Sequence, residues 1–484
     1  MYVHLRDREI SPMEQPYVRI KSVEINNFKN VGHGKLDFEK FMDGKYASSV
    51  LGLYGQNGSG KTALIDVLEL LKFALSGGTI PARFSNYIKA GSPCSVIRYE
   101  FRMWGEDGEA DFYSYEVSIR REIDDSSNIT DPHPSSDRIK YKTVLFDEVL
   151  SYAGECNGKR SRCTPLIDTR TEAGTVFKPA VKYKALAGKG KDTLTKLLVA
   201  KQLALASSRS FLFSRDFLSV LKENCPDTYY RGINRLALFG NYELFVINTS
   251  NTSLISLDAL PLAINYTENG TASIGNILIN LNEPTMIPEK AYDIVQKVIR
   301  SMNIVLKQIV PGLTICVKDL GKQMHTDGTV VCRIQLLSNR NGVEIPLQCE
   351  SEGIKKLISV LQLMIVVYNK PSISVAIDEL DSGIFEYLLG ELLRIISEKG
   401  KGQLIFTSHN LRPLETLDKR FIAFTTTNPD KRYVRPNNIK STNNVRNVYY
   451  RDIVLGGSSD PLYDQTNNAE IAFAFREAGV PDAP

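Results

Sequence analysis

A glycine-rich segment of eight residues constrains the fold of this chain more than any other feature. Residues 55–62 read GQNGSGKT; the apolar stretch VLGLY precedes them, and leucines follow at positions 64, 68, 71 and 75. This order predicts a buried strand, a tight loop and a helix with one buried face. Glycines let such a loop point its N–H groups at phosphate oxygens, the lysine reaches the β- and γ-phosphates, and the threonine hydroxyl holds Mg²⁺. We therefore expect the loop to bind ATP through Asn57, Gly58, Ser59, Gly60, Lys61 and Thr62, and Mg²⁺ through Thr62.

Length and composition indicate a globular protein of two or three domains. The chain has 484 residues, of which 43% are hydrophobic and 24% charged. It has no apolar run long enough to span a bilayer and no secretory signal at its start, so we expect a cytoplasmic protein without a membrane partner. Its seven cysteines form no CxxC pair and are expected to be reduced thiols. The net charge of +4 does not by itself imply a nucleic-acid partner.

Hydrophobic periodicity predicts two kinds of structure on either side of a less regular middle. Residues 1–16 read as a tail that orders only on contact. Residues 155–340 are harder to interpret, but they lack the heptads of a long coiled coil, so any helical insertion is short. The expected early strands are 18–25, 32–38, 50–54, 95–104, 112–120 and 141–150, which favour an antiparallel β subdomain after the first helix. The expected later elements are helices at 192–207, 288–310, 353–368 and 384–399, and strands at 373–377, 403–407 and 421–425.

Two carboxylates follow one of the late strands. Residues 374–379 read SVAIDE, as a Walker B segment requires, with Asp378 in the Mg²⁺ shell and Glu379 polarising the attacking water. Alone, the pair would also suit an exposed strand end. The next strand ends just before His409, which suits a contact with the γ-phosphate; without its partners it would be an ordinary surface histidine.

A serine and a glycine precede the helix before this strand. Residues 350–356 read ESEGIKK, which resembles the signature motif with which ABC-type ATPases grip the γ-phosphate bound by another copy of the chain; Ser351 and Gly353 would be its serine and glycine. Ser351 would also serve as an ordinary N-cap, with Glu352 in the first turn.

With these motifs in this order, the chain resembles the ABC-type AAA ATPases related to SMC proteins and OLD nucleases, a family frequent in bacterial anti-phage systems. Residues 18–62 and 347–424 carry the resemblance, including the strand that ends at Lys29. It implies an α/β fold, namely an ABC-type, SMC-like P-loop ATPase head with an antiparallel β subdomain and a short helical insertion. It also implies that Lys29 contacts nucleotide and that Glu379 and His409 are catalytic. Asp381 would cross the interface of a homo-oligomer, a dimer of heads or higher, in which hydrolysis sites form between chains.

One residue of the family pattern is missing from this chain. No glutamine occurs between Gln56 and Gln202, so the usual Q-loop glutamine that couples the metal to the second lobe is absent.

The motifs also set the expected domain boundaries. We expect an N-terminal ATPase lobe at 17–150, a helical or mixed insertion at 151–345, a C-terminal ATPase lobe at 346–425 and a tail region at 426–484.

The resemblance points to a separate effector. The segment after His409 is too short for the TOPRIM nuclease of OLD enzymes and contains no Asp-x-Asp, and the clustered histidines of an HNH nuclease are absent. The layout resembles the ATPase subunits of two-gene defence systems. PARIS fits best, in which the ATPase holds a TOPRIM nuclease subunit until a phage-encoded trigger protein is sensed; Septu and AbiL-type systems remain open.

The alternative is an SMC-like ATPase that acts directly on DNA in repair or maintenance. Two basic runs would suit a nucleic-acid partner, although such runs are usually solvated faces or contacts with an acidic partner. The first contains Lys178, Lys182, Lys184, Lys189, Lys191 and Lys196, and the second spans 431–446. A transporter ATPase is disfavoured, because a long insertion separates the P-loop from the signature serine.

Overall fold

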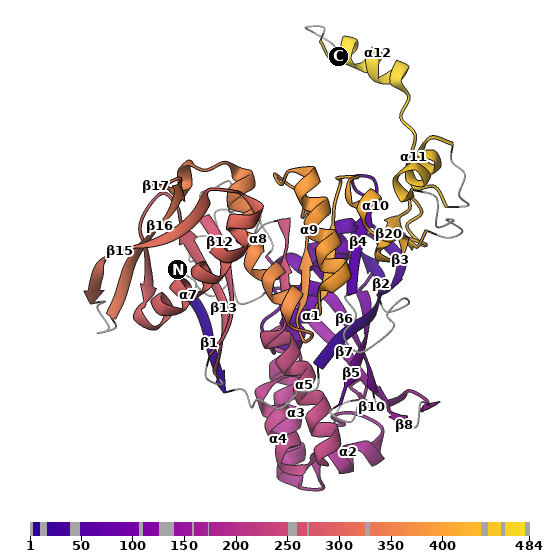
Figure 1. The fold of residues 1–484 in the computed structure, drawn as a ribbon. Helices are drawn as coiled ribbons and strands as arrows, with labels where there is room; N and C mark the ends of the chain where they lie inside the picture. Colours follow the sequence, from indigo (N-terminus) through magenta and orange to yellow (C-terminus); the bar gives the residue numbers. More distant parts are fainter. Residues whose placement is uncertain are drawn as a thin grey trace, which may run out of the picture.

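The structure is a computed structural model, and its helices and strands are drawn in Figure 1. It describes residues 3–9, 17–38, 49–105, 110–124, 140–156, 159–172, 174–249, 259–268, 271–324, 330–436, 444–455 and 460–479. The sequence also predicts a hairpin turn at 105–108 and a polar loop at 124–138, and most of both lies outside these ranges.

The early strands form one antiparallel sheet of six strands in the order β10-β7-β6-β5-β2-β3. Alternating apolar side chains on these strands bury one face, as a half-buried sheet requires. The antiparallel β subdomain expected from the sequence is therefore present. Its strands are β2 (Tyr17–Phe28), β3 (Val31–Asp37), β5 (Ser95–Trp104), β6 (Ala110–Ile123), β7 (Tyr141–Ala153) and β10 (Thr164–Asp168).

A second six-stranded sheet carries the motifs, in the order β11-β18-β19-β4-β20-β21. Its first five strands are parallel and β21 is antiparallel to β20. Because the carboxyl ends of parallel strands meet at one edge, the segments that follow β4, β18 and β19 come together there. The strands are β4 (Ser49–Tyr54), β11 (Leu244–Ile247), β18 (Ser374–Ile377), β19 (Gln403–Thr407), β20 (Ile422–Thr425) and β21 (Tyr433–Val434).

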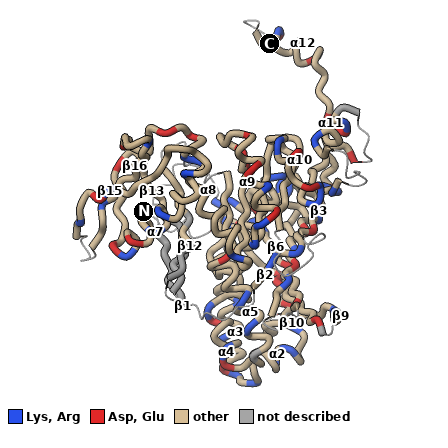
Figure 2. Tube along the Cα trace, in the orientation of Figure 1, with Lys and Arg blue, Asp and Glu red and all other residues tan. Residues whose placement is uncertain are grey.

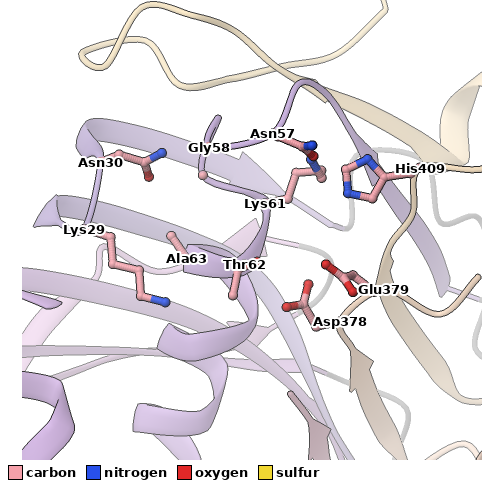
Figure 3. A pocket seen from close by; sticks show the side chains of 11 residues that line it. Lys29, Asn30, Asn57, Gly58, Lys61, Thr62, Ala63, Asp378, Glu379 and His409 are labelled. Carbon is pink, nitrogen blue, oxygen red and sulfur yellow. The ribbon is translucent and has the colours of Figure 1, made fainter. Parts of the chain in front are cut away.

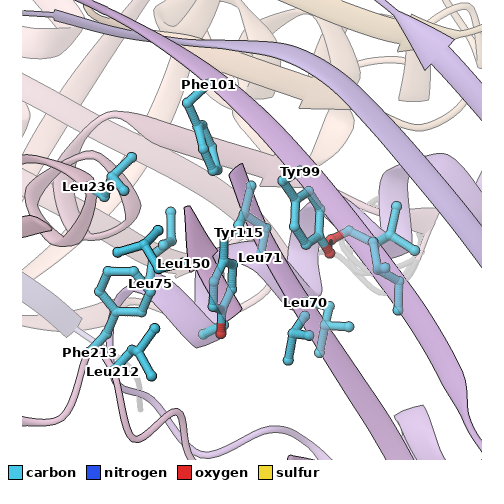
Figure 4. Close-up of a cluster of buried hydrophobic side chains, with 14 of the residues drawn as sticks. Leu70, Leu71, Leu75, Tyr99, Phe101, Tyr115, Leu150, Leu212, Phe213 and Leu236 are labelled. Atoms are coloured by element: carbon cyan, nitrogen blue, oxygen red, sulfur yellow. Dashed lines mark hydrogen bonds between the residues drawn. The ribbon is translucent and has the colours of Figure 1, made fainter. Parts of the chain in front are cut away.

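Helix α1 (Lys61–Leu75) lies between the two sheets. Its leucines pack on Tyr99 and Phe101 of β5 and on Tyr115 of β6 (Figure 4), and Tyr99 Oη donates to the Val67 carbonyl at 2.6 Å. The expectation of one buried face was too narrow, because α1 is buried on nearly every side. The other face of the parallel sheet packs against α8 (Glu352–Asn369), α9 (Glu386–Lys399) and α10 (Pro413–Thr416).

The middle of the chain divides between two cores. Residues 180–242 form a helical protrusion, drawn in magenta in Figure 1, whose apolar side chains join the core around α1. Helix α3 lies where the sequence predicted a helix, and the insertion is short, as expected. The helices are α2 (Ala180–Ala187), α3 (Lys191–Ala206), α4 (Arg215–Asn224) and α5 (Asp227–Tyr242); the short elements η1 (Ala82–Tyr87), β8 (Glu155–Cys156) and β9 (Lys159–Arg160) precede them.

Residues 259–346 share a core with the signature helix α8 instead, through side chains such as Leu262, Val298 and Leu361. Residues 3–9, expected to be part of a tail, form β1 (Val3–Glu9), which pairs with β13 and so satisfies its backbone groups. The other elements are β12 (Ala259–Glu268), β13 (Thr271–Asn280), β14 (Thr285–Pro288), α7 (Glu289–Ile309), β15 (Leu313–Met324), β16 (Val330–Arg340), β17 (Val343–Pro346) and η3 (Leu347–Cys349).

Much of the region expected to be a tail packs on the ATPase core. Tyr433 on β21 is buried beside α1, and Tyr449 stacks on Phe424 with ring centroids 4.8 Å apart. Strand pairing and these aromatic contacts hold the segment in place. Beyond η4 (Lys419–Phe421), the helices are α11 (Val445–Leu455) and α12 (Asn468–Ala478), and α12 stands clear of the body (Figure 1).

Candidate nucleotide-binding site

The glycine loop after β4 has the backbone of a phosphate cradle. Gly58 and Gly60 have φ angles of 76° and 94°, which glycine adopts without strain. A Cβ on Gly55 would lie 1.7 Å from Thr425 Oγ1, so that position excludes any side chain. Helix α1 then begins at Lys61 without a side-chain cap and without an acidic residue in its first turn. Its free N–H groups and the positive end of its dipole suit an anion.

Lys61 lies across this loop. Its Nζ donates to the carbonyl oxygens of Gly55 and Gln56 at 2.8 and 2.9 Å, and the residue is 6% exposed. Burial lowers the pKa of the Lys61 ammonium, while the nearby carboxylates, Asp378 first, oppose that shift. An ammonium held by two neutral carbonyls in a buried place is well placed to bind phosphate oxygens.

Two adjacent carboxylates follow β18. Asp378 is fully buried, and its oxygens accept hydrogen bonds from the hydroxyls of Thr407 and Thr249. These two bonds leave lone pairs for a further donor or a hydrated metal ion. Glu379 has a φ of 47°, an uncommon backbone for this residue, and its N–H donates to Thr407 Oγ1 at 2.8 Å. Strain of this kind concentrates at functional sites.

These groups surround one cavity of about 290 Å³. Asp378, Glu379 and His409 lie on one side of the glycine loop, and Lys29 and Asn30 on the other (Figure 3). No glutamine is among the described residues that line this cavity, and the sequence likewise lacks the Q-loop glutamine. The structure thus brings together most of the predicted site residues. The cavity is lined by Lys29, Asn30, Asn57, Gly58, Gly60, Lys61, Thr62, Ala63, Asp378, Glu379 and His409.

Ser59 and Lys29 are held by contacts within the chain. The Ser59 hydroxyl donates to the Gln56 carbonyl at 2.6 Å, and Ser59 does not appear in the described lining. Lys29 pairs with Asp66 on α1, and its Nζ lies 4.0 Å from the centre of the Tyr87 ring. Burial raises the pKa of Asp66, and the Lys29 charge opposes that shift. Asp66 lies one helical turn after Thr62, so this spacing in the sequence could have identified Asp66 as a neighbour of the site.

Ser351, Gly353 and Asp381 contact their own chain and are absent from the described lining. Ser351 Oγ accepts a hydrogen bond from the Ile354 N–H at 3.4 Å, so Ser351 is the N-cap of α8, as the alternative interpretation of the sequence expected. Asp381 Oδ2 accepts from the N–H groups of His409 and Asn410 at 3.0 and 2.9 Å, so Asp381 braces the loop that carries His409. Its Oδ1 is buried and has no hydrogen-bond partner among the described residues.

No sequence pattern pointed to the C-terminal residues that support the loop. Tyr433 Oη donates to the Gly60 carbonyl at 3.0 Å, and Arg432 Nη2 donates to the Asn30 carbonyl at 2.6 Å. Both residues lie in a segment that the sequence suggested to be a tail. Their contacts hold the two sides of the cavity from a distant part of the chain.

Gly353 is predicted to be intolerant of alanine. A Cβ there would lie 2.1 Å from the backbone oxygen of Gly383, and backbone yields less readily than a side-chain end. We expect Gly353→Ala to lower the free energy of unfolding by about 1–3 kcal/mol, despite the better helix propensity of alanine. Urea denaturation measures this, with the exposed neighbour Glu352→Ala as the control. If the free energies of unfolding of Gly353→Ala and of the control differ by less than about 0.5 kcal/mol, as expected for surface substitutions, the close contact between Gly353 and Gly383 would be contradicted.

Lys356 on α8 is predicted to make stability depend on pH. The residue is 3% exposed, and burial lowers its pKa to about 8, against the attraction of nearby carboxylates, Glu379 first. An unfolded lysine has a pKa of about 10.4, so between these values the unfolded chain binds more protons and stability rises with pH.

The matched variant is Lys356→Met, which keeps the stem and removes the charge. Relative to this variant, wild type should gain about 1 kcal/mol per pH unit in free energy of unfolding between about pH 8 and about pH 10. Urea denaturation of both proteins across that window measures the difference. A difference that stays constant with pH would show that the lysine is not buried as described.

Comparisons with known proteins place this site in a family. The family model described as "AAA domain, putative AbiEii toxin, Type IV TA system" matches residues 50–415, which include the glycine loop, Asp378, Glu379 and His409. A curated relative, the DNA replication and repair protein RecF of Deinococcus radiodurans, is 32% identical over 88 residues. That match covers 18% of this chain and 21% of the relative.

Solved structures with a similar course of the chain have low identity and low TM-scores. An SMC head bound to the C-winged helix domain of ScpA has a TM-score of 0.39 and 13% identity, covering 86% of this chain and 97% of that one. The recombination mediator protein RecF with ATP has a TM-score of 0.32 and 14% identity, covering 81% and 94%. Among the described helices, none has the length and hydropathy needed to cross a bilayer.

Proposed function

Because this chain belongs to the family described as "AAA domain, putative AbiEii toxin, Type IV TA system" and is a P-loop ATPase, we propose that two copies close around ATP and thereby control a separate effector subunit. The system would be a bacterial anti-phage defence of the PARIS type, acting in the cytoplasm. This chain would take the part of AriA, the effector would be a TOPRIM nuclease, and a phage-encoded protein would be the trigger.

One observation supports the proposal: the described cavity lacks part of the predicted site. The cavity contains the glycine loop, both carboxylates and His409, but Ser351 and Gly353 are absent from its described lining. Its volume of about 290 Å³ is at the lower end of ligand pockets, so part of a nucleotide would remain uncovered. A second copy that presents Ser351 and the N-terminus of α8 would cover it.

The predicted site residues have the following roles in this proposal. Lys61 and the N–H groups of the loop bind the β- and γ-phosphates, with Lys29, Asn57, Gly58, Ser59 and Gly60 positioning the nucleotide. Glu379 orients and polarises the attacking water, and His409 contacts the γ-phosphate. Thr62 and Asp378 hold Mg²⁺, which, when bound, neutralises charge on the phosphates. Asp381 orients His409 through the two backbone hydrogen bonds.

A phage challenge tests the control of an effector. The gene and its neighbours are expressed together in a sensitive bacterial host, with wild type or Lys61→Ala in the ATPase position. We expect protection that requires both Lys61 and the neighbouring gene. Protection that Lys61→Ala leaves intact, or that the chain gives without any neighbour, would contradict the proposal.

The second candidate is an SMC-like ATPase that acts on DNA, which the match to part of a RecF protein and a basic surface favour. Figure 2 shows lysines along α2 and α3, and Lys184, Lys189, Lys191 and Lys196 are exposed. Duplex DNA binding by the isolated chain would weaken steeply with salt if these lysines contact phosphates. Binding that is absent at low salt, or unchanged when these lysines are replaced, would exclude this candidate.

A further inference from the structure

Helix α12 exposes apolar side chains that nothing in the described chain covers. It has 11 residues, and none of them is buried. Ile471 and Phe475 lie one turn apart on one face and are 42% and 77% exposed, while Phe473, on the opposite side of the helix, is 66% exposed. Figure 1 shows the helix away from the rest of the chain. A helix of this length is marginal in water without tertiary packing, although its N-cap Asn467 accepts from the Ala469 N–H at 3.0 Å. Its apolar face therefore needs a partner.

The segment that leads to α12 is fixed at the mouth of the nucleotide cavity. Leu462 is buried in the core beneath the parallel sheet, and the Thr427 N–H donates to the Pro461 carbonyl at 2.8 Å. The Asp464 N–H donates to Oε1 of Gln56 in the glycine loop at 3.0 Å. Only residues 465–467 separate this contact from the helix. The helix therefore starts beside the glycine loop, on the face that a second ATPase copy would cover.

We propose that α12 docks on a second copy of this chain, against the apolar surface at the start of α9. This rests on the proposed composite site, in which the glycine loop of one copy faces Ser351 of the other. Phe385, the residue just before α9, is 71% exposed. It lies two residues after Gly383, which touches Gly353 of the signature segment. A helix that starts at the glycine loop of one copy thus meets Phe385 of the other, together with Tyr387.

The docking makes the helix a clasp around the composite site. Two copies related by a two-fold axis would exchange their helices, so the same apolar contact would form twice in one dimer. The clasp raises the affinity of one copy for the other. It does so without contacting nucleotide, because α12 begins only after the contact between Asp464 and Gln56. It also makes closure depend on the C-terminal segment, which the nucleotide motifs alone do not require.

The test measures ATP-induced dimerisation of the full chain in a Glu379→Gln background, which keeps ATP bound. Ile471→Asp with Phe475→Asp should raise the dimer dissociation constant by about tenfold or more, since burying a large apolar side chain contributes at least that factor. Phe385→Asp should have the same effect. Glu470→Gln with Glu477→Gln, on the polar side of the helix, is the matched control. Binding of ATP by the monomer should be unchanged in all variants.

A photo-crosslinker at position 475 identifies the partner directly. Nitrogen-15-labelled and unlabelled chains are mixed with ATP, and crosslinks between a labelled and an unlabelled chain near Phe385 are expected. Crosslinks within one chain only, crosslinks that require the product of a neighbouring gene, or unchanged dimerisation of the Ile471 and Phe475 variant would overturn the docking and leave the composite site intact. A background protein that does not dimerise with ATP would overturn both.

Discussion

Lys61→Ala is expected to abolish ATP binding. Lys61 and Lys29 are the two lysines in the described lining. The Lys61 ammonium donates to two loop carbonyls, and it can exchange these hydrogen bonds for hydrogen bonds to phosphate oxygens. Loss of charge-assisted hydrogen bonds to the β- and γ-phosphates should weaken ATP binding by roughly a hundredfold or more. Isothermal titration calorimetry with Mg²⁺ and ATP measures the change. Lys35→Ala, at an exposed position on β3, is the control.

A fall in affinity smaller than about tenfold, with a folded variant, would mean that nucleotide binds elsewhere. Thermal unfolding without nucleotide separates this result from misfolding. Because Lys61 is buried as a cation, its removal should leave stability without nucleotide nearly unchanged or raise it slightly.

Glu379→Gln is expected to keep ATP binding and to stop hydrolysis. The amide has the shape of the carboxylate, and the backbone N–H of residue 379 still donates to Thr407 Oγ1. It cannot take a share of the proton from the attacking water, which should lower kcat by about 10²–10⁴-fold. Because ATP then persists, copies should accumulate in the closed state. Phosphate release and light scattering measure the two effects, with Glu398→Gln at an exposed position near the end of α9 as the control.

Wild-type turnover in Glu379→Gln would show that this carboxylate does not polarise the water. In that case Asp378 would be tested next, although two threonine hydroxyls already contact its oxygens. Slow turnover together with weak ATP binding would instead mean that Glu379 positions nucleotide.

The parts of the site that could be predicted from sequence are those built from short continuous segments. Residues 55–62 and 374–379 each carry their chemistry within one strand and the loop after it, so spacing alone identifies them. The sheet then places them together, because parallel strands end at one edge. The burial of α1 on nearly every side was missed, since its leucine spacing indicates one stripe and does not show a second sheet.

Contacts between distant segments could not be predicted. Strand β11 has only four residues, too few for a periodic pattern, and it brings Thr249 to Asp378. Residues 259–346 look like an insertion in sequence, and only their packing assigns them to the core of α8. Tyr433 and Arg432 lie in a polar stretch, and their hydrogen bonds to Gly60 and Asn30 join positions that no local rule connects.

The most direct test of the composite site mixes two inactive chains. Lys61→Ala removes the phosphate grip, and Ser351→Arg blocks the signature surface that a second copy would present, so each chain alone should fail to hydrolyse ATP. An equal mixture should recover roughly a quarter of the wild-type rate, because random pairing makes half of the dimers mixed and each has one intact site of two. A mixture as inactive as its components, or Ser351→Arg chains active alone, would contradict a site shared between copies.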